Sequence, residues 1–105
     1  MLVAVIDRRW LETADENERR RLDQENDFVR IEIQTALERN IPVVPVLVEG
    51  AVMPRAIQLP DVLRDLARRN AAELRPGAMF HQQLESLVNK LEQTLKSSQQ
   101  NFRPL

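Results

Sequence analysis

Glu32 is the residue whose type and position could carry chemistry. It belongs to a segment, Asn26–Leu37, in which apolar residues recur at helical spacing. At roughly 100° per residue, Glu32 falls inside the apolar arc of this helix. The arc consists of Phe28, Val29, Ile33, Ala36 and Leu37. An acid directed at packed surface tends to be desolvated, so Glu32 is either a boundary residue that reaches water along its own stem or a group held for chemistry.

The composition fits one small globular domain and argues against several kinds of site. The chain has 105 residues, of which 43% are hydrophobic and 30% charged, enough for a modest core. Fifteen basic and sixteen acidic residues give a net charge of -1, so we expect no nucleic-acid binding. The absence of cysteine and the single histidine argue against a disulfide framework, thiolate chemistry and a metal site. Without an export signal or a membrane-spanning apolar segment, we expect a cytoplasmic protein with no membrane partner.

The chain alternates segments typical of strands and helices. Leu2–Ile6 and Val43–Val48 are continuous apolar runs, as in strands buried on both faces, although Pro45 would usually mark an edge or a bulge. Between them, a helix is expected from an N-cap at Asn26 or Asp27 to about Arg39, with Asn40 in the left-handed conformation at its end. Two parallel strands joined by such a helix form a right-handed βαβ unit.

The second half of the chain predicts smaller elements and one long helix. We expect a loop at Met53–Leu59, a short helix at Asp61–Arg69, a short edge strand at Ala71–Leu74 and an amphipathic helix from Phe80 to Leu95. Residues 1–96 would form the domain, and the polar tail 97–105 is expected to be disordered.

Other conspicuous residues have ordinary structural explanations. His81 has no second ligand or nucleophile nearby in sequence, so an exposed or capping role is expected. Trp10 is expected to anchor packing, and the triplet Arg19–Arg21 to pair with neighbouring acids. The stripe on the last helix indicates core or a dimer seam, and it consists of Leu84, Val88, Leu91 and Leu95.

Several of these segments together resemble the C-terminal part of a bacterial Toll/interleukin-1 receptor (TIR) domain. The resemblance rests on the two apolar strands, Trp10, Met53-Pro54, Leu59-Pro60 and Phe80. Its most specific element is an aromatic residue followed four positions later by glutamate, here Phe28 and Glu32. This chain has Phe28 where many members carry Trp, and Asn26 where many carry Ser.

The resemblance implies an α/β, flavodoxin-like TIR fold, truncated, with a parallel sheet flanked by helices. The family order is 2-1-3-4-5, so Leu2–Ile6 would be the third strand, and the segment with the first two strands and their helices is missing. An apolar strand without its neighbour exposes unpaired backbone groups. We therefore expect self-association by strand pairing along Leu2–Ile6 or by swapping.

The same resemblance implies a role for Glu32. Enzymatic TIR domains split NAD between nicotinamide and ribose through an oxocarbenium-like transition state. Nicotinamide leaves as a neutral molecule, so one carboxylate suffices, and Glu32 would stabilise positive charge on the sugar. Phe28 and Asn26 would contribute to nucleotide binding. NAD would be a substrate, and neither a cofactor nor a metal is implied.

Two classes of function remain open. The chain is either a TIR-like signalling or defence module that associates with other TIR domains or with itself, or an NAD glycohydrolase that uses Glu32. The missing segment favours the first for this chain alone, because a single carboxylate cannot orient a dinucleotide. The second would require completion by a missing N-terminal half or by oligomerisation.

Overall fold

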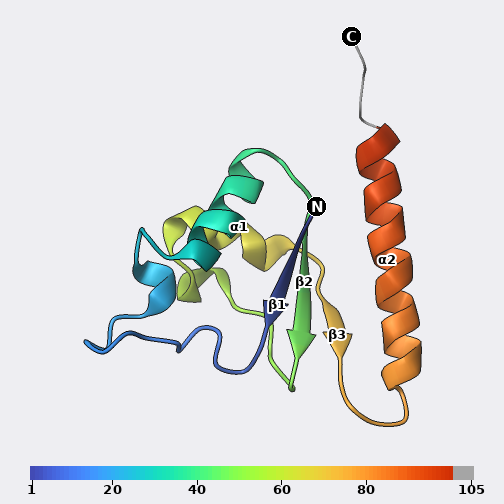
Figure 1. Cartoon of the computed structure of the whole chain (residues 1–105), viewed down its shortest axis with the longest axis horizontal. Coiled ribbons are helices and arrows are strands. Elements are labelled where there is room, and N and C mark those ends of the chain that lie inside the picture. The colour runs from blue at the N-terminus through green and yellow to red at the C-terminus, as the bar shows by residue number, and fades with distance from the viewer. Residues whose placement is uncertain (101–105) are drawn as a thin grey trace.

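The computed structural model describes residues 1–100, with side chains through Ser97 (Figure 1). Its strands are β1 (Leu2–Ile6), β2 (Val43–Val48) and β3 (Ala72–Leu74), and its α-helices are α1 (Phe28–Glu38) and α2 (Phe80–Gln100). Three 3₁₀ segments complete it: η1 (Arg21–Asp23), η2 (Ala56–Gln58) and η3 (Asp61–Arg68).

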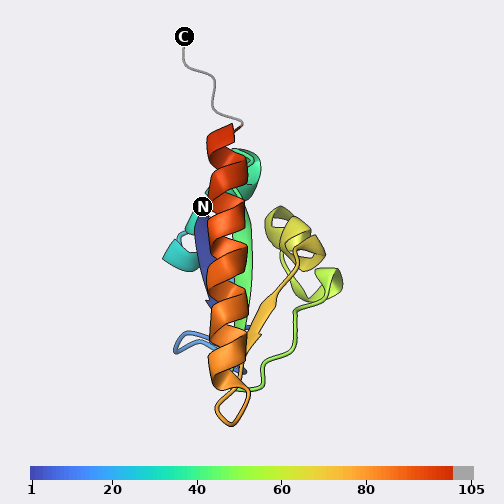
Figure 2. The same cartoon turned by 90° about the vertical axis from the view of Figure 1, so that its right-hand side faces the viewer.

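The three strands form one parallel sheet in the order β1-β2-β3. Helix α1 and segment η3 lie on one face of this sheet and α2 lies on the other, which is clearest when the two views are compared (Figures 1 and 2). A parallel sheet flanked by helices is the α/β architecture predicted from the sequence, and it is consistent with a flavodoxin-like fold.

Helix α1 begins and ends where the sequence predicts. The Asp27 side chain caps its start, because Oδ2 accepts a hydrogen bond from the Arg30 backbone N–H at 2.9 Å. Asn40 follows the helix in the left-handed conformation, with φ of 56°. Asp27, rather than Asn26, is therefore the N-cap. A short connection then joins α1 to β2.

Pro45 is buried in β2, the central strand of the described sheet, rather than at an edge or a bulge. The Leu2 N–H donates to the Pro42 carbonyl at 2.8 Å, so Pro42, Val44 and Val46 direct their backbone groups at β1. The nitrogen of Pro45 therefore faces β3. Since β3 is paired only from Val46 onward, no rung of the assigned ladder needs an N–H at position 45.

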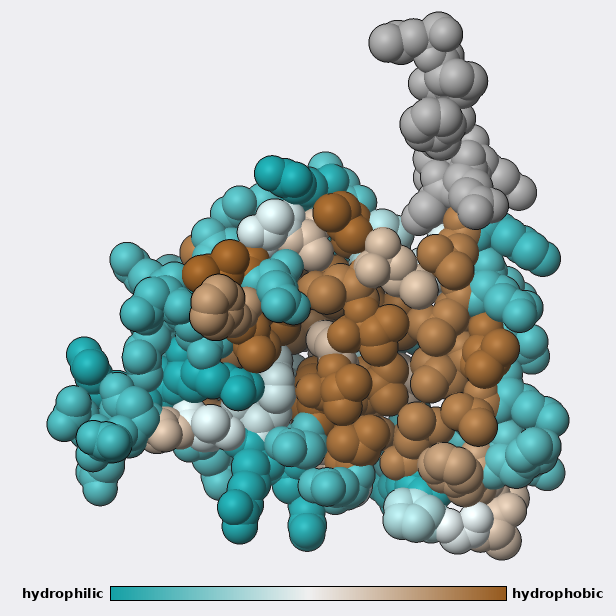
Figure 3. All heavy atoms as spheres, viewed as in Figure 1, coloured by the Kyte–Doolittle hydropathy of each residue, from teal (hydrophilic) through white to brown (hydrophobic). Residues whose placement is uncertain are grey.

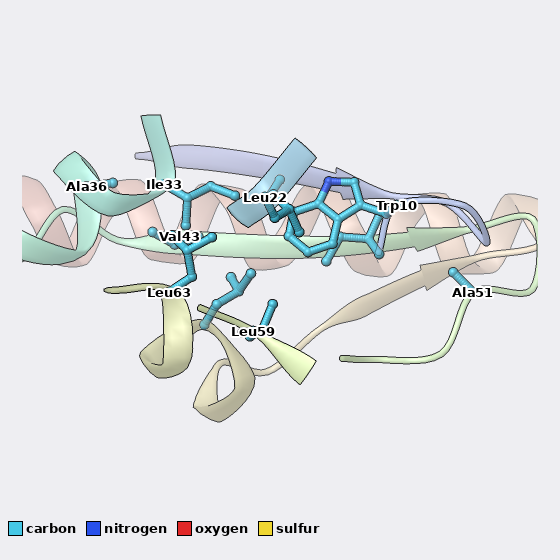
Figure 4. Packing of buried hydrophobic residues seen from close by; sticks show 11 residues of the cluster. Trp10, Leu22, Ile33, Ala36, Val43, Ala51, Leu59 and Leu63 are labelled. Atoms are coloured by element: carbon cyan, nitrogen blue, oxygen red, sulfur yellow. The ribbon is translucent and has the colours of Figure 1, made fainter. Parts of the chain in front are cut away.

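The main hydrophobic core lies between the sheet and the layer of α1 and η3 (Figure 4). Trp10 and Leu22 join this core from the segment after β1, so the predicted packing role of Trp10 is confirmed. Leu63 and Leu66 of η3 are both 0% exposed. The cluster consists of Ala4, Ile6, Trp10, Leu22, Ile33, Ala36, Val43, Ala51, Leu59, Leu63 and Leu66.

The opposite face is covered only in part. Side chains alternate along a strand, so Val44 and Val46 face α2, where Leu87 is buried as well. Two side-chain bonds tie α2 to the segments around β3: Lys90 Nζ donates to the Asn70 carbonyl at 2.5 Å, and Gln83 Oε1 accepts from the Arg75 N–H at 2.7 Å. Apolar side chains over β1 and the adjoining side of α2 stay visible (Figure 3).

Two sequence expectations need correction. Phe28 was placed in the apolar arc of α1 but is 80% exposed. The buried face of this helix is narrower than the arc, since its buried residues are Ile33 and Ala36. Helix α2 continues to Gln100, four residues past the expected boundary at Lys96, since neither Gly nor Pro interrupts it. The remainder of the expected tail, residues 101–105, lies outside the described residues.

Candidate functional site

Glu32 lines a groove of about 380 Å³ that runs along the open edge of β1. Leu2 and Ala4 form its floor on the α1 side of the strand, and Val3 and Val5 line it along the strand edge. Helix α1 forms one wall through Val29, Glu32 and Ile33. The groove therefore joins the only sequence-predicted catalytic residue to the strand edge that has no neighbour in the described sheet.

The rotation of α1 explains why Glu32 sits at the rim. Ile33 is buried against the sheet, and Glu32 precedes it by about 100° around the helix. This rotation moves the carboxylate from the face packed on the sheet to the side of α1 above the β1 edge, where Glu32 is exposed. Glu32 therefore lies at the groove and in contact with solvent.

The carboxyl end of β1 supplies the polar end of the groove. Asp7 follows the strand directly and accepts a hydrogen bond from the Arg9 N–H at Oδ1, at 3.0 Å. Arg21 lines the same groove, and its Nε lies 3.6 Å from Oδ1 of the capping residue Asp27. One guanidinium and two carboxylates therefore share the groove with the indole of Trp10.

Asn26 and Phe28, the other two predicted site residues, do not line the groove with Glu32. Asn26 is exposed and lines a separate depression, together with Arg19 and Arg20. Phe28 lies one helical turn before Glu32 but projects into solvent. Glu32 thus shares the groove with Asp7, Trp10 and Arg21, and not with Asn26 and Phe28.

The arginine triplet stabilises the loop between β1 and α1, which contributes Trp10, Thr13 and Arg21 to the groove. Arg19 Nε lies 3.3 Å from Asp15 Oδ2, and Arg20 Nη2 lies 2.9 Å from Asp23 Oδ1, so the predicted local ion pairing is confirmed. The hydrogen bond from the Arg20 side chain lowers the pKa of Asp23. The backbone hydrogen bond from Arg19 is the main cause that lowers the pKa of Asp15. Arg20 also donates to the Gln58 carbonyl at 2.7 Å, which ties the loop to η2.

The described residues contain neither a metal-ligand cluster nor a membrane-spanning helix. Among residues 1–100, no group of three or more His, Asp or Glu side chains could hold a metal ion. No helix in that range has the length and hydropathy needed to cross a bilayer.

Asp7 and Arg21 were not predicted as site residues. Asp7 carries a readable signal, because ligands in open parallel sheets bind beyond the carboxyl ends of the strands and Asp7 is the first residue after one. Arg21 carries no such signal, because its position depends on how the loop folds back.

No family model, curated protein or solved structure matches the chain.

Proposed function

We propose that the chain is a TIR-like association module of signalling or defence assemblies, derived from NAD-cleaving TIR domains, and that it does not cleave NAD alone. One observation carries the proposal: the groove that contains Glu32 lies on an unpaired strand edge of the described sheet. Such an edge is suited to receive another chain.

The size and shape of the groove argue against NAD cleavage by the single chain. A volume of about 380 Å³ falls near the low end of the roughly 300–1,000 Å³ that ligand pockets occupy. A dinucleotide must also be enclosed well enough to fix the reacting bond. A groove with one helical wall and an exposed carboxylate offers little of that enclosure.

The alternative is an NAD glycohydrolase whose site is completed by a further segment or a second chain. Its support is that Glu32 lines the groove beside Asp7 and Arg21, so a carboxylate and a guanidinium face the same space. In that scheme Glu32 would stabilise the oxocarbenium-like sugar as neutral nicotinamide leaves. Arg21 could bind a phosphate oxygen.

Nicotinamide release from NAD distinguishes the two proposals. We expect the purified chain to release nicotinamide no faster than buffer, at every protein concentration tested. Turnover that Glu32→Gln abolishes would establish the alternative, because this change keeps the shape and removes the charge. Glu38→Gln is the matched control, since Glu38 is an exposed glutamate of α1 that does not line the groove.

The association proposal has its own readout. The mass of the chain, measured by sedimentation over a dilution series, is expected to rise with concentration. A mass equal to one chain throughout the series would contradict self-association. The module would then need a different TIR domain as its partner.

A further inference from the structure

The backbone of β1 has hydrogen-bonding groups on its open side that the described sheet leaves unused. Leu2 donates to Pro42, and successive residues of a strand direct their backbone groups to opposite sides. Leu2, Ala4 and Ile6 therefore bond to β2. Val3 and Val5 direct their N–H and C=O groups away from the sheet.

The open edge also lacks the features by which proteins protect such edges. Natural edge strands carry charged residues, prolines or bulges, or they are covered by another segment. The run Leu2–Ile6 contains no charged residue and no proline, and its register with β2 is continuous. Val3 and Val5 are 39% and 59% exposed.

An apolar surface extends from this edge onto α2. Val3 and Val5 lie on the α2 face of the sheet, as Val44 and Val46 do. The hydropathy colouring shows a continuous hydrophobic area over β1 and the adjoining side of α2 (Figure 3). Leu84, Val88 and Leu95 of α2 are 38%, 45% and 44% exposed, whereas Leu87 is buried against the sheet.

We propose that this surface binds a second copy of the chain, through antiparallel pairing of the two β1 strands about a two-fold axis at Ala4. This inference rests on the proposed association function and specifies its partner and surface. The joined sheet has the order β3-β2-β1-β1-β2-β3.

The register of β1 is self-complementary, which is the reason for choosing a second copy as the occupant. With Ala4 opposite Ala4, Val3 of one copy lies opposite Val5 of the other. Both residues have their unused groups on the facing side, so each of the two Val3–Val5 pairs exchanges two N–H···O=C bonds. A two-fold axis repeats every contact, as isologous dimers require.

The same two-fold axis brings the exposed apolar side chains of the two copies to one face of the joined sheet. It places both α2 helices on one face of the joined sheet, with the four valines between them. A pairing of two five-residue strands alone is smaller than the roughly 1,200–2,000 Å² of a stable interface. The exposed apolar side chains of Leu84, Val88 and Leu95 on α2 are therefore proposed as the source of further buried area beside the valines.

Charge and backbone substitutions at Val5 test the proposal by sedimentation over a dilution series. Val5→Lys places two ammonium groups beside the axis, so we expect the dimer dissociation constant to rise at least tenfold. Val5→Pro removes an N–H that does not bond to β2, and we expect a similar rise. Val52→Lys is the matched control, because Val52 is 83% exposed and lies outside β1. It should leave the constant unchanged.

Amide exchange in the unmodified chain gives an independent readout. Protection of the Val3 and Val5 amides should increase with protein concentration, whereas protection of Ala4, which bonds to β2, should not follow the dimer. A dimer that is equally tight in both Val5 variants, with concentration-independent Val3 and Val5 amides, would overturn this interface and leave the association function standing. A chain that is monomeric throughout would overturn this inference as well as self-association.

Discussion

The two faces of the sheet differ in how completely they are covered. On the α1 and η3 face, Leu63 and Leu66 are fully enclosed. On the α2 face, Leu87 is buried, but Leu84 and its neighbours on the stripe keep much of their surface in solvent. The comparison teaches that the two layers contribute unequally to folding stability: the first face is fully packed, whereas the second keeps apolar surface in contact with solvent.

The largest expected effect compares one leucine from each face. Leu66→Ala leaves a cavity in a closed core and should lower the free energy of unfolding by about 2–5 kcal/mol. Leu84→Ala removes the same atoms from an exposed position and should cost less than about 1 kcal/mol. Urea denaturation at a concentration where the chain is monomeric measures both. Equal losses would mean that the two faces are equally well packed.

A smaller effect is expected at the start of α1, which carries Glu32 and part of the closed core. Asp27→Ala removes the side chain that accepts the Arg30 N–H, and should cost about 1 kcal/mol of unfolding free energy. Asp61→Ala is a suitable control, because its side chain is 84% exposed in a surface ion pair. If both substitutions cost the same, the cap contributes nothing beyond a surface charge.

The smallest expected effect is the acid sensitivity of the loop between β1 and α1. The Arg20 hydrogen bond lowers the pKa of Asp23 in the folded chain, so its stabilisation is present above the unfolded pKa of about 3.9 and is lost as pH falls through the folded value. Asp23→Asn should remove this contribution, which is below about 1 kcal/mol for so exposed a pair. Unfolding free energies measured from about pH 6 to pH 3 test this, and Arg20→Met should flatten the same window.

The elements of the βαβ unit could be predicted from the sequence because their signals are local. Strand hydrophobicity, the Asp27 cap and the left-handed Asn40 each depend on a few consecutive residues. The exposure of Phe28 could not be predicted in this way. Helical periodicity locates the centre of a buried face, but its width depends on the partners that cover it.

The candidate site was predictable only in part, for the same reason. Glu32 stands out by its place on a helix, and that place could be read from the sequence. Its neighbours Asp7 and Arg21 come from a loop whose path depends on distant contacts, such as the bond from Arg20 to the Gln58 carbonyl. A sequence pattern therefore identified the carboxylate and not the groove around it.

Pro45 has a consequence for how α2 is attached. Extending the β2–β3 register by one rung places Pro45 opposite Ala71, and the ladder would aim an N–H at position 45 toward the Asn70 carbonyl. Proline has no such hydrogen, so this acceptor is left over by the sheet. The Lys90 ammonium donates to it instead, at 2.5 Å. Because Pro45 donates no hydrogen bond, the Asn70 carbonyl is available to Lys90, and this bond attaches α2 to the segment before β3.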